Sequence, residues 1–307
     1  CLMSILPIDH GIFASSAVSG AAAAGYFGGG NDGSTVTTVD RFLFSDDSRT
    51  TLGTGLSSAR QYGAGMASPV AGYIGGGAGG YSDVVDRFLF SDDSRTTLSP
   101  GLSGARGYLS ANASSVAGYF GGGAEAAAPY VVATVNRFLF SDDSRTTLGT
   151  GLSAGRYWLA GMASSVAGYF GGGSGSLTTV DRFLFSDDSR TTLGTGLATG
   201  RYWLAANASS VAGYFGGGVE SVTDLTSVER FLFSNDSRTT LGTGLSVGGK
   251  GPAGMASADA GYFGGGDNGG NTTNVDRFLF SNDSRTTLGT GLSSATKNLA
   301  GMANLGA

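Results

Sequence analysis

The sequence has little of the residue types that carry most protein chemistry: among 307 residues there is one cysteine, one histidine and five prolines. A single cysteine, Cys1, excludes an intramolecular disulfide, and one Cys with one His cannot form a Cys/His zinc site. His10 is the only histidine and lies outside the repeats, which argues against a His-based catalytic triad. We therefore expect no cofactor, no metal site and no enzymatic activity.

Charged residues and long apolar runs are also scarce. Only 13% of residues are charged, and the net charge is −5. This argues against a nucleic-acid partner, which needs a basic face to neutralise phosphates, and against a polybasic membrane-binding role. No apolar run reaches the length of a membrane helix, so no membrane span is predicted. Residues 1–13, CLMSILPIDHGIF, lack the basic start and cleavage motif of a signal peptide.

What the sequence has instead is glycine, 56 residues of it, and a repeat. The motif GY(F/I)GGG occurs six times, at spacings of 47, 46, 50, 45 and 48 residues. Its tyrosines are Tyr26, Tyr73, Tyr119, Tyr169, Tyr214 and Tyr262. This period is typical of propeller blades and is too long for most helical or leucine-rich repeats.

Each repeat is predicted to form four short strands, as the fourth repeat illustrates. The strands are 157–165, 167–173, 179–186 and 190–197, and a polar SDDS turn joins the last two. No segment shows a sustained 3.6-residue apolar period, so almost no helix is expected. The fold class is therefore all-β: a six-bladed β-propeller with four-stranded antiparallel blades over 24–307, preceded by an N-terminal extension, 1–23, that could add one strand.

The third strand of each repeat carries apolar groups on both faces. In the first repeat Phe42 and Phe44 point one way, whereas Val39 and Leu43 point the other. A sheet packed between two other sheets needs this pattern. Burying one Phe contributes about 1.5–3 kcal/mol, so these residues could hold the ring together.

An arginine on the Val39 face recurs in every repeat and needs a partner, because a buried charge is costly alone. We expect that partner to be one of the aspartates of the SDDS turn, in the same or an adjacent blade. The expected structural ladder contains the arginines and the invariant second turn aspartates: Arg41, Arg87, Arg137, Arg182, Arg230, Arg277, Asp47, Asp93, Asp143, Asp188, Asp236 and Asp283.

The order of these features resembles the kelch-repeat β-propeller. The matching residues are Gly28 and Gly29, the strand 39–44, Leu56 and Arg60, with the same set in later repeats. The resemblance spans 24 to about 305, and the Trp of the fourth kelch strand is absent. This resemblance implies a β-propeller fold. Near-identical repeats of this texture are also similar to those of bacteriophage tail or fibre proteins and bacterial surface proteins, which implies a location on a virion or outside a cell.

The SDDS turn resembles a degenerate Asp box. Ser45, Asp47 and Thr51 match the pattern Ser-x-Asp-x-Gly-x-Thr-Trp, whereas Arg49 and Leu52 replace its Gly and Trp. The resemblance implies a folding role for the turn and no catalytic one.

Ring closure has two solutions in the sequence. The first-strand pattern recurs at 298–304, which could complete the blade of Tyr26. A similar pattern at 14–22 could take that place instead and leave the C-terminal strand free to join another subunit, building a homo-oligomer. We favour the first.

The repeats differ in two connections: the loop between the second and third strands, and the link from one repeat to the next. Both emerge on one face of the predicted ring, which is how a binding surface on a rigid scaffold looks. On that face an arginine precedes an aromatic residue by two positions, and Lys250/Pro252 and Lys297/Asn298 replace the pair in the last two repeats. The candidate binding residues are Arg60, Tyr62, Arg106, Tyr108, Arg156, Tyr157, Trp158, Arg201, Tyr202 and Trp203.

Arg beside an aromatic residue can stack on a sugar or anchor a protein. The alternative is that the arginine is the structural arginine of kelch repeats and the aromatic residue packs between blades. The predicted function is non-catalytic recognition or assembly on a virion or bacterial surface, through a glycan or protein partner. The alternatives are a homopolymeric fibre subunit and an intracellular interaction scaffold.

Overall fold

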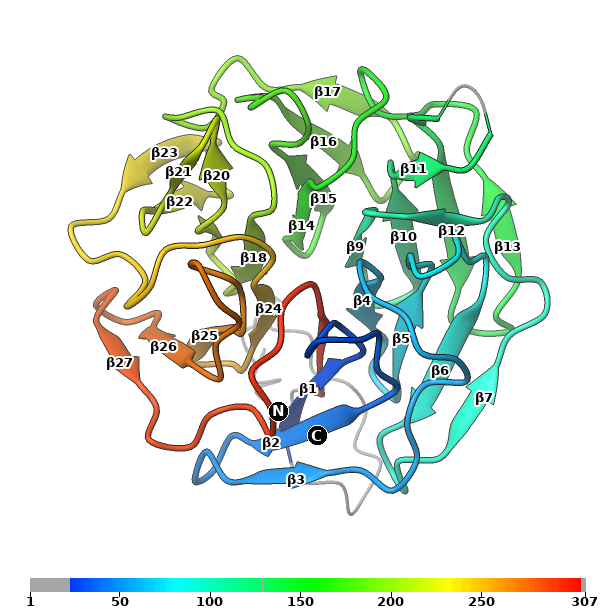
Figure 1. Cartoon of the computed structure of the whole chain (residues 1–307). Coiled ribbons are helices and arrows are strands. Elements are labelled where there is room, and N and C mark those ends of the chain that lie inside the picture. Colours follow the sequence, from blue (N-terminus) through cyan, green and yellow to red (C-terminus); the bar gives the residue numbers. More distant parts are fainter. Residues whose placement is uncertain (1–22, 128–129, 305–307) are drawn as a thin grey trace, which may run out of the picture.

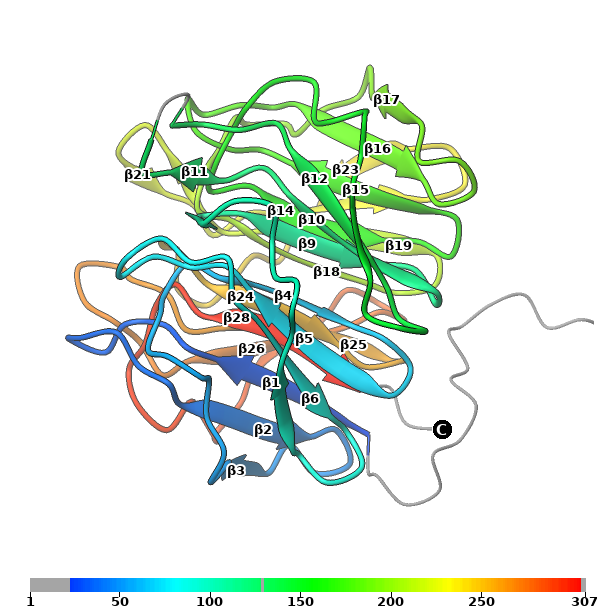
Figure 2. The same ribbon diagram turned by 90° about the vertical axis from the view of Figure 1, so that its right-hand side faces the viewer.

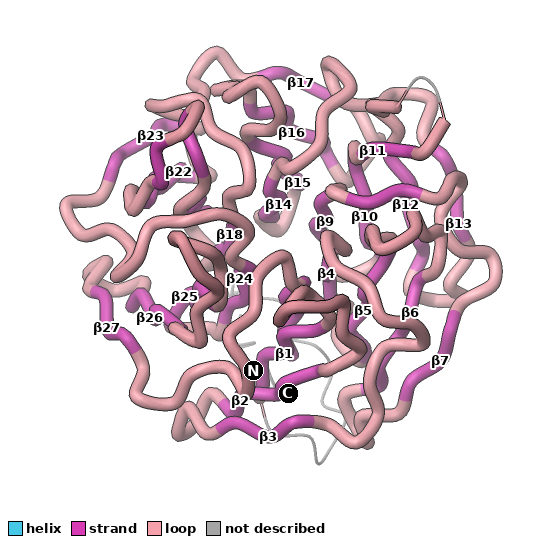
Figure 3. The backbone as a smooth tube through the Cα atoms, viewed as in Figure 1, coloured by secondary structure: helices cyan, strands magenta, loops and turns pink. Residues whose placement is uncertain are grey.

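The structure, a computed structural model, describes residues 23–127 and 130–304, which form a ring of six four-stranded antiparallel sheets (Figure 1). The described residues contain no helix (Figure 3). The predicted all-β, six-bladed propeller is therefore confirmed. The proposed extension, including the candidate strand at 14–22, lies outside the described residues except for Ala23.

The first three blades are built as follows from the axis outward. Blade 1 contains β28 (Ala300–Asn304), β1 (Ala24–Gly28), β2 (Val39–Leu43) and β3 (Arg49–Thr51). Blade 2 contains β4 (Ala64–Ala67), β5 (Ala71–Gly75), β6 (Val85–Leu89) and β7 (Arg95–Thr97). Blade 3 contains β9 (Ser110–Ala113), β10 (Ala117–Gly121), β12 (Val135–Leu139) and β13 (Arg145–Thr147).

The other three blades repeat this plan. Blade 4 contains β14 (Ala160–Ala163), β15 (Ala167–Gly171), β16 (Val180–Leu184) and β17 (Arg190–Thr192). Blade 5 contains β18 (Ala205–Ala208), β19 (Ala212–Gly216), β22 (Val228–Leu232) and β23 (Ser237–Thr240). Blade 6 contains β24 (Ala253–Ala256), β25 (Ala260–Gly264), β26 (Val275–Leu279) and β27 (Arg285–Thr287).

Two further sheets have two short strands each and lie in the loops. One pairs β8 (Arg106–Gly107) with β11 (Ala124–Glu125), and the other pairs β20 (Val219–Glu220) with β21 (Thr223–Asp224).

The first and fourth strands are shorter than the sequence predicts. In blade 4 the innermost strand begins at Ala160 instead of 157, and the outermost ends at Thr192 instead of 197. The residues beyond these limits form the links between blades, where buried Leu197 and Leu204 pack into the core.

The ring is closed by the C-terminal strand. β28 pairs antiparallel with β1, so that Tyr26 lies opposite Met302. The simple closure is confirmed, and the alternative with a free C-terminal strand is wrong for this structure, because that strand already occupies the innermost place of blade 1.

The core lies between adjacent blades, as the two-faced third strand predicts. Val39 packs in a cluster with Phe88 of blade 2, whereas Phe42 packs with Met255 and Tyr262 of blade 6. Glycine permits this close contact: a Cβ on Gly121 would lie 2.8 Å from the ring of Phe170 in the next blade. Apolar rings and bare backbone thus interlock around the whole propeller.

A belt of ion pairs also joins each blade to the next. Arg41 Nη1 donates to Asp93 Oδ2 of blade 2 at 2.5 Å, and the hydroxyl of Tyr26 donates to Asp93 Oδ1 at 2.9 Å. The same arrangement recurs in all six blades, and we call these residues the belt. Its pairs are Arg41–Asp93, Arg87–Asp143, Arg137–Asp188, Arg182–Asp236, Arg230–Asp283 and Arg277–Asp47.

The belt connects neighbouring blades and leaves its tyrosines protonated over a wide pH range. Burial and the adjacent carboxylate raise the pKa of Tyr262 to about 12 and the pKa values of the five equivalent tyrosines further. Asp47 adopts φ = 55°, a left-handed conformation that aspartate tolerates better than most residues.

The two faces of the ring are built from different connections. One face, which we call the uniform face, carries the short turns after each first and third strand, such as 68–70 and 90–94. The other, the variable face, carries the loops after each second strand, such as 76–84, and the links between blades, such as 52–63. Figure 1 looks onto the variable face, and Figure 2 shows β11 and β21 on that side of the ring.

Candidate binding face

The links between blades place the predicted arginines beneath the variable face. Arg60, Arg106, Arg156 and Arg201 are 0–3% exposed. Arg60 Nη2 donates to Asp86 Oδ2 at 2.8 Å and to the carbonyl of Ile74 at 3.2 Å. Their assignment as ligand-contacting residues is therefore corrected: their guanidinium groups are buried in the scaffold, which agrees with the structural alternative.

Three of these arginines have a buried carboxylate partner that the sequence reasoning missed. The pairs are Arg60–Asp86, Arg156–Asp181 and Arg201–Glu229. Burial alone would raise the pKa of Asp181, but hydrogen bonds from Thr192 and Ser153 and the charge of Arg156 outweigh it and lower that pKa. The signal was present as the residue before the belt arginine, which is acidic in five repeats.

Blade 3 is the exception, because Asn136 stands where the others have a carboxylate. Arg106 Nη2 donates to Asn136 Oδ1 at 2.9 Å, and no carboxylate among the described residues lies within ion-pairing distance of Arg106. Its Nε and Nη1 atoms are buried without a hydrogen-bond partner in the described part of the chain. Burial lowers the pKa of the Arg106 guanidinium to about 10.

At the centre of the variable face, six link residues form a closed circle of backbone hydrogen bonds. Each N–H donates to the carbonyl of the equivalent residue in the preceding link, at 2.8–3.0 Å. The circle runs through Tyr62, Tyr108, Trp158, Trp203, Gly251 and Asn298. It confirms Asn298 at the aromatic position and corrects the rest of the alignment of the last two repeats. Gly251, not Pro252, occupies the other aromatic position, and Gly249 and Thr296, not Lys250 and Lys297, occupy the arginine position.

All six residues of this circle have left-handed backbone, with φ between 58° and 65°. Glycine adopts this conformation freely and asparagine tolerates it, but Tyr and Trp do so at a cost of roughly 1–3 kcal/mol each. Four bulky aromatic residues therefore occupy positions that would be less strained with the residues found in blades 6 and 1.

These aromatic residues and their neighbours form one continuous arc. We define the aromatic arc as Tyr62, Tyr81, Tyr108, Tyr157, Trp158, Tyr202 and Trp203. Ring centroids are 4.2 Å apart for Tyr62–Tyr108, 5.5 Å for Tyr108–Trp158 and 4.2 Å for Trp158–Trp203. Tyr202 stacks on Trp158 at 5.4 Å and anchors itself by donating to the Ser221 carbonyl. Tyr157 and Tyr202 are thus brought to the predicted site, and Tyr81 joins them unpredicted.

The arc rings are partly buried and partly open. Tyr81 is 36% exposed, and the others are half-buried. Burial raises the pKa values of Tyr62 and Tyr108 above the ordinary value of tyrosine.

The rest of the circle is polar. Lys250 and Lys297 occupy the position that Tyr157 and Tyr202 have in other blades. Lys297 Nζ donates to Asp267 Oδ2 at 2.5 Å, and Lys250 Nζ lies 5.8 Å from the ring centroid of Trp203. The Asn298 amide donates to Gln61 Oε1 at 3.4 Å, next to Tyr62. The variable face is therefore aromatic over blades 2–5 and polar over blades 6 and 1.

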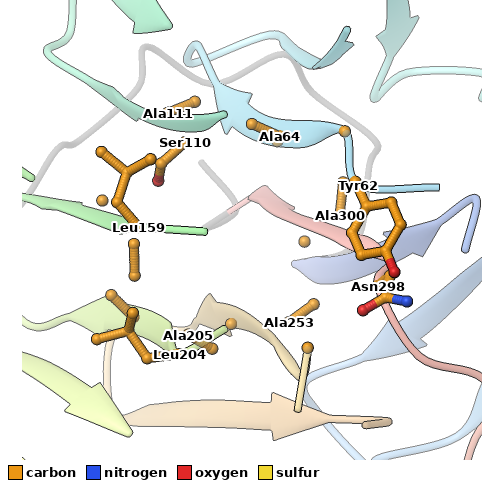
Figure 4. Close-up of a pocket in the computed structure, with 18 of the residues that line it drawn as sticks. Tyr62, Ala64, Ser110, Ala111, Leu159, Leu204, Ala205, Ala253, Asn298 and Ala300 are labelled. Atoms are coloured by element: carbon orange, nitrogen blue, oxygen red, sulfur yellow. The ribbon is translucent and has the colours of Figure 1, made fainter. Parts of the chain in front are cut away.

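Beneath the circle lies an axial cavity of about 110 Å³ (Figure 4). Small residues of the innermost strands line it, among them Ala64, Ala111, Ala205 and Ala300. Tyr62 and Asn298 lie side by side at its rim. Alanine, glycine and leucine make up most of its lining, and Ser110 and Asn298 are among its few polar side chains, so the cavity itself offers little chemistry.

Comparisons with known proteins found no matching protein-family model and no matching curated protein. The kelch-like and Asp-box resemblances therefore rest on the residues quoted above. Among the described residues, no helix is long and apolar enough to cross a membrane. Within the same ranges no three His, Cys, Asp or Glu side chains are grouped so as to hold a metal ion.

Proposed function

We propose that this protein is a non-catalytic recognition module that binds a glycan or protein through its variable face, on the outside of a virus particle or bacterial cell. The propeller fold is compatible with such a role. The observation that carries the proposal is the contrast between a uniform face, repeated in six blades, and a variable face with a strained aromatic arc.

The proposed location is supported by the similarity of the repeats to kelch-like repeats of phage tail and bacterial surface proteins. A homopolymeric fibre subunit is the weaker candidate, because β28 is used within its own ring. An intracellular interaction scaffold would use the same face but would bind proteins only.

The test is binding of the labelled full chain to intact bacterial cells and to glycan and peptide arrays. Changing Tyr157 and Tyr202 to Ser should reduce binding at least tenfold. The matched control changes Val116 and Val166 on the uniform face, 64% and 63% exposed, to Ser and should leave binding intact. Loss of binding in the control alone would overturn the assignment of the variable face.

A further inference from the structure

We infer that the aromatic arc is a platform for an oligosaccharide, which stacks on the rings of Trp158, Trp203 and Tyr202 and hydrogen-bonds to the polar groups of blades 6 and 1. This inference rests on the proposed function and deepens it by choosing between glycan and protein.

The backbone of the central circle is strained where it carries aromatic residues. Gly251 and Asn298 show which residues hold the left-handed conformation most easily, yet the four other positions carry Tyr or Trp. Strain of this kind persists where the side chain is used. In blades 3, 4 and 5 the residue that follows the ring, Leu109, Leu159 or Leu204, is itself buried, so these rings are not required to fill the core.

The variable face combines aromatic rings with hydrogen-bonding side chains. A sugar ring presents an apolar C–H face and a rim of hydroxyls, so its site needs aromatic faces beside hydrogen-bonding groups. The arc supplies the aromatic faces. The amides of Gln61 and Asn298 and the ammonium group of Lys250 lie at its two ends.

The paired backbone at the centre of the variable face favours a glycan over a peptide. A peptide that binds as an added strand needs unpaired backbone donors and acceptors. At the centre of the variable face the backbone N–H groups of the circle are bonded to one another, and the flanking loops pair with the links, as Gln61 does with Ala78. A ligand here must be recognised by side chains, and flat rings in an arc suit a chain of sugars.

The charges on this face argue against nucleic acid, whose bases also stack on aromatic rings. Such a platform needs cations along the backbone of the strand. On this face Lys297 is paired with Asp267, the four link arginines are buried, and the net charge is −5.

The chain carries its own probe, because Trp158 and Trp203 are its two tryptophans. Their fluorescence should shift saturably when the full chain is titrated with hexasaccharides of cellulose, chitin, xylan or mannan. Calorimetry should then show that W203G weakens binding of the active sugar at least tenfold, with a Tm unchanged or higher because strain is relieved. The matched control is Y130N, which also replaces a left-handed aromatic residue, with φ = 58° and 60% exposure, but outside the arc.

The outcomes are distinct. A peptide ligand lost in W203G would overturn the oligosaccharide and leave the proposed function intact. A sugar whose binding survives W203G and fails in Y130N would place recognition elsewhere on the face and overturn the platform. A Tm lowered by W203G would show that the ring is packing. If neither arrays nor cells bind the protein, the proposed function fails as well.

Discussion

The two faces of the propeller use aromatic and charged residues in opposite ways. Near the uniform face, six tyrosines, six arginines and six aspartates form one repeated belt in which every member has a partner in an adjacent blade. On the variable face, the aromatic residues occupy strained backbone in four blades and are replaced in two. Identical copies thus serve the ring, whereas unequal copies mark where a ligand is expected to bind.

The largest predicted effect comes from the belt at alkaline pH. Each belt tyrosine has a pKa raised in the folded state, so the stability it contributes is complete below pH 10 and is lost as the pH rises through the folded pKa. Between pH 10 and 12 the unfolded chain ionises six tyrosines that the folded ring keeps protonated. Stability should fall by about 1.4 kcal/mol per tyrosine per pH unit, or about 8 kcal/mol per pH unit for the six together.

We therefore expect cooperative alkaline unfolding, in which tyrosinate absorbance and loss of the β-sheet circular dichroism signal coincide. Y119F should reduce the slope of stability against pH by about one sixth. Gradual ionisation of the belt tyrosines in a ring that stays folded would contradict the prediction.

The next largest effect concerns the buried arginine–carboxylate pairs beneath the variable face. D181A removes the partner of the buried Arg156 and should destabilise the protein by about 3–5 kcal/mol in urea unfolding. As a control, V222S in the exposed loop of blade 5 should change stability by less than about 0.5 kcal/mol. Equal effects of the two would show that Arg156 is not the structural residue that its burial indicates.

A smaller effect, of opposite sign, concerns the innermost strands. Asn112 and Asn207 stand where the other four blades have Met, and their amide atoms are buried without partners among the described residues. Both pack against a glycine of the next blade, as Met66 does. N112M should stabilise the protein by about 1–3 kcal/mol, because an unsatisfied amide is removed.

In the blades with Met the preceding residue is Gly, whereas Ala111 precedes Asn112. The double variant A111G/N112M is therefore the matched comparison. If both variants melt below the natural protein, Asn112 has a hydrogen-bonding role that the described contacts do not show.

The smallest effect concerns the exception in blade 3. N136D gives Arg106 the carboxylate that its counterparts have and should raise stability by about 1–2 kcal/mol at neutral pH. D181N, which gives blade 4 the arrangement of blade 3, should act in the opposite direction. Thermal unfolding of the two variants side by side would show the contrast, and a loss of stability in N136D would contradict it.

The sequence predicted the fold because the same pattern occurs six times, so that one unit defines all. It predicted that the belt arginines pair with aspartates of the SDDS turn, since an arginine such as Arg41 on an apolar strand face required a partner. It could not show how deeply each side chain is buried: Arg60 and Tyr62 are two positions apart, yet Arg60 is fully buried against Asp86 whereas Tyr62 is half-buried. It also misaligned Gly251 and the arginine position of the last two repeats, because glycine shares a backbone conformation with tryptophan that the sequence alone does not reveal.

The closed circle of backbone hydrogen bonds has a consequence for how this gene can change. Near-identical repeats invite unequal recombination, which adds or deletes whole copies. A circle of six N–H···O contacts at 2.8–3.0 Å passes from each link to the next and ends where it began. A chain with five or seven repeats would have to reform that circle with another circumference, so products of recombination should persist mainly when they exchange repeats without changing their number.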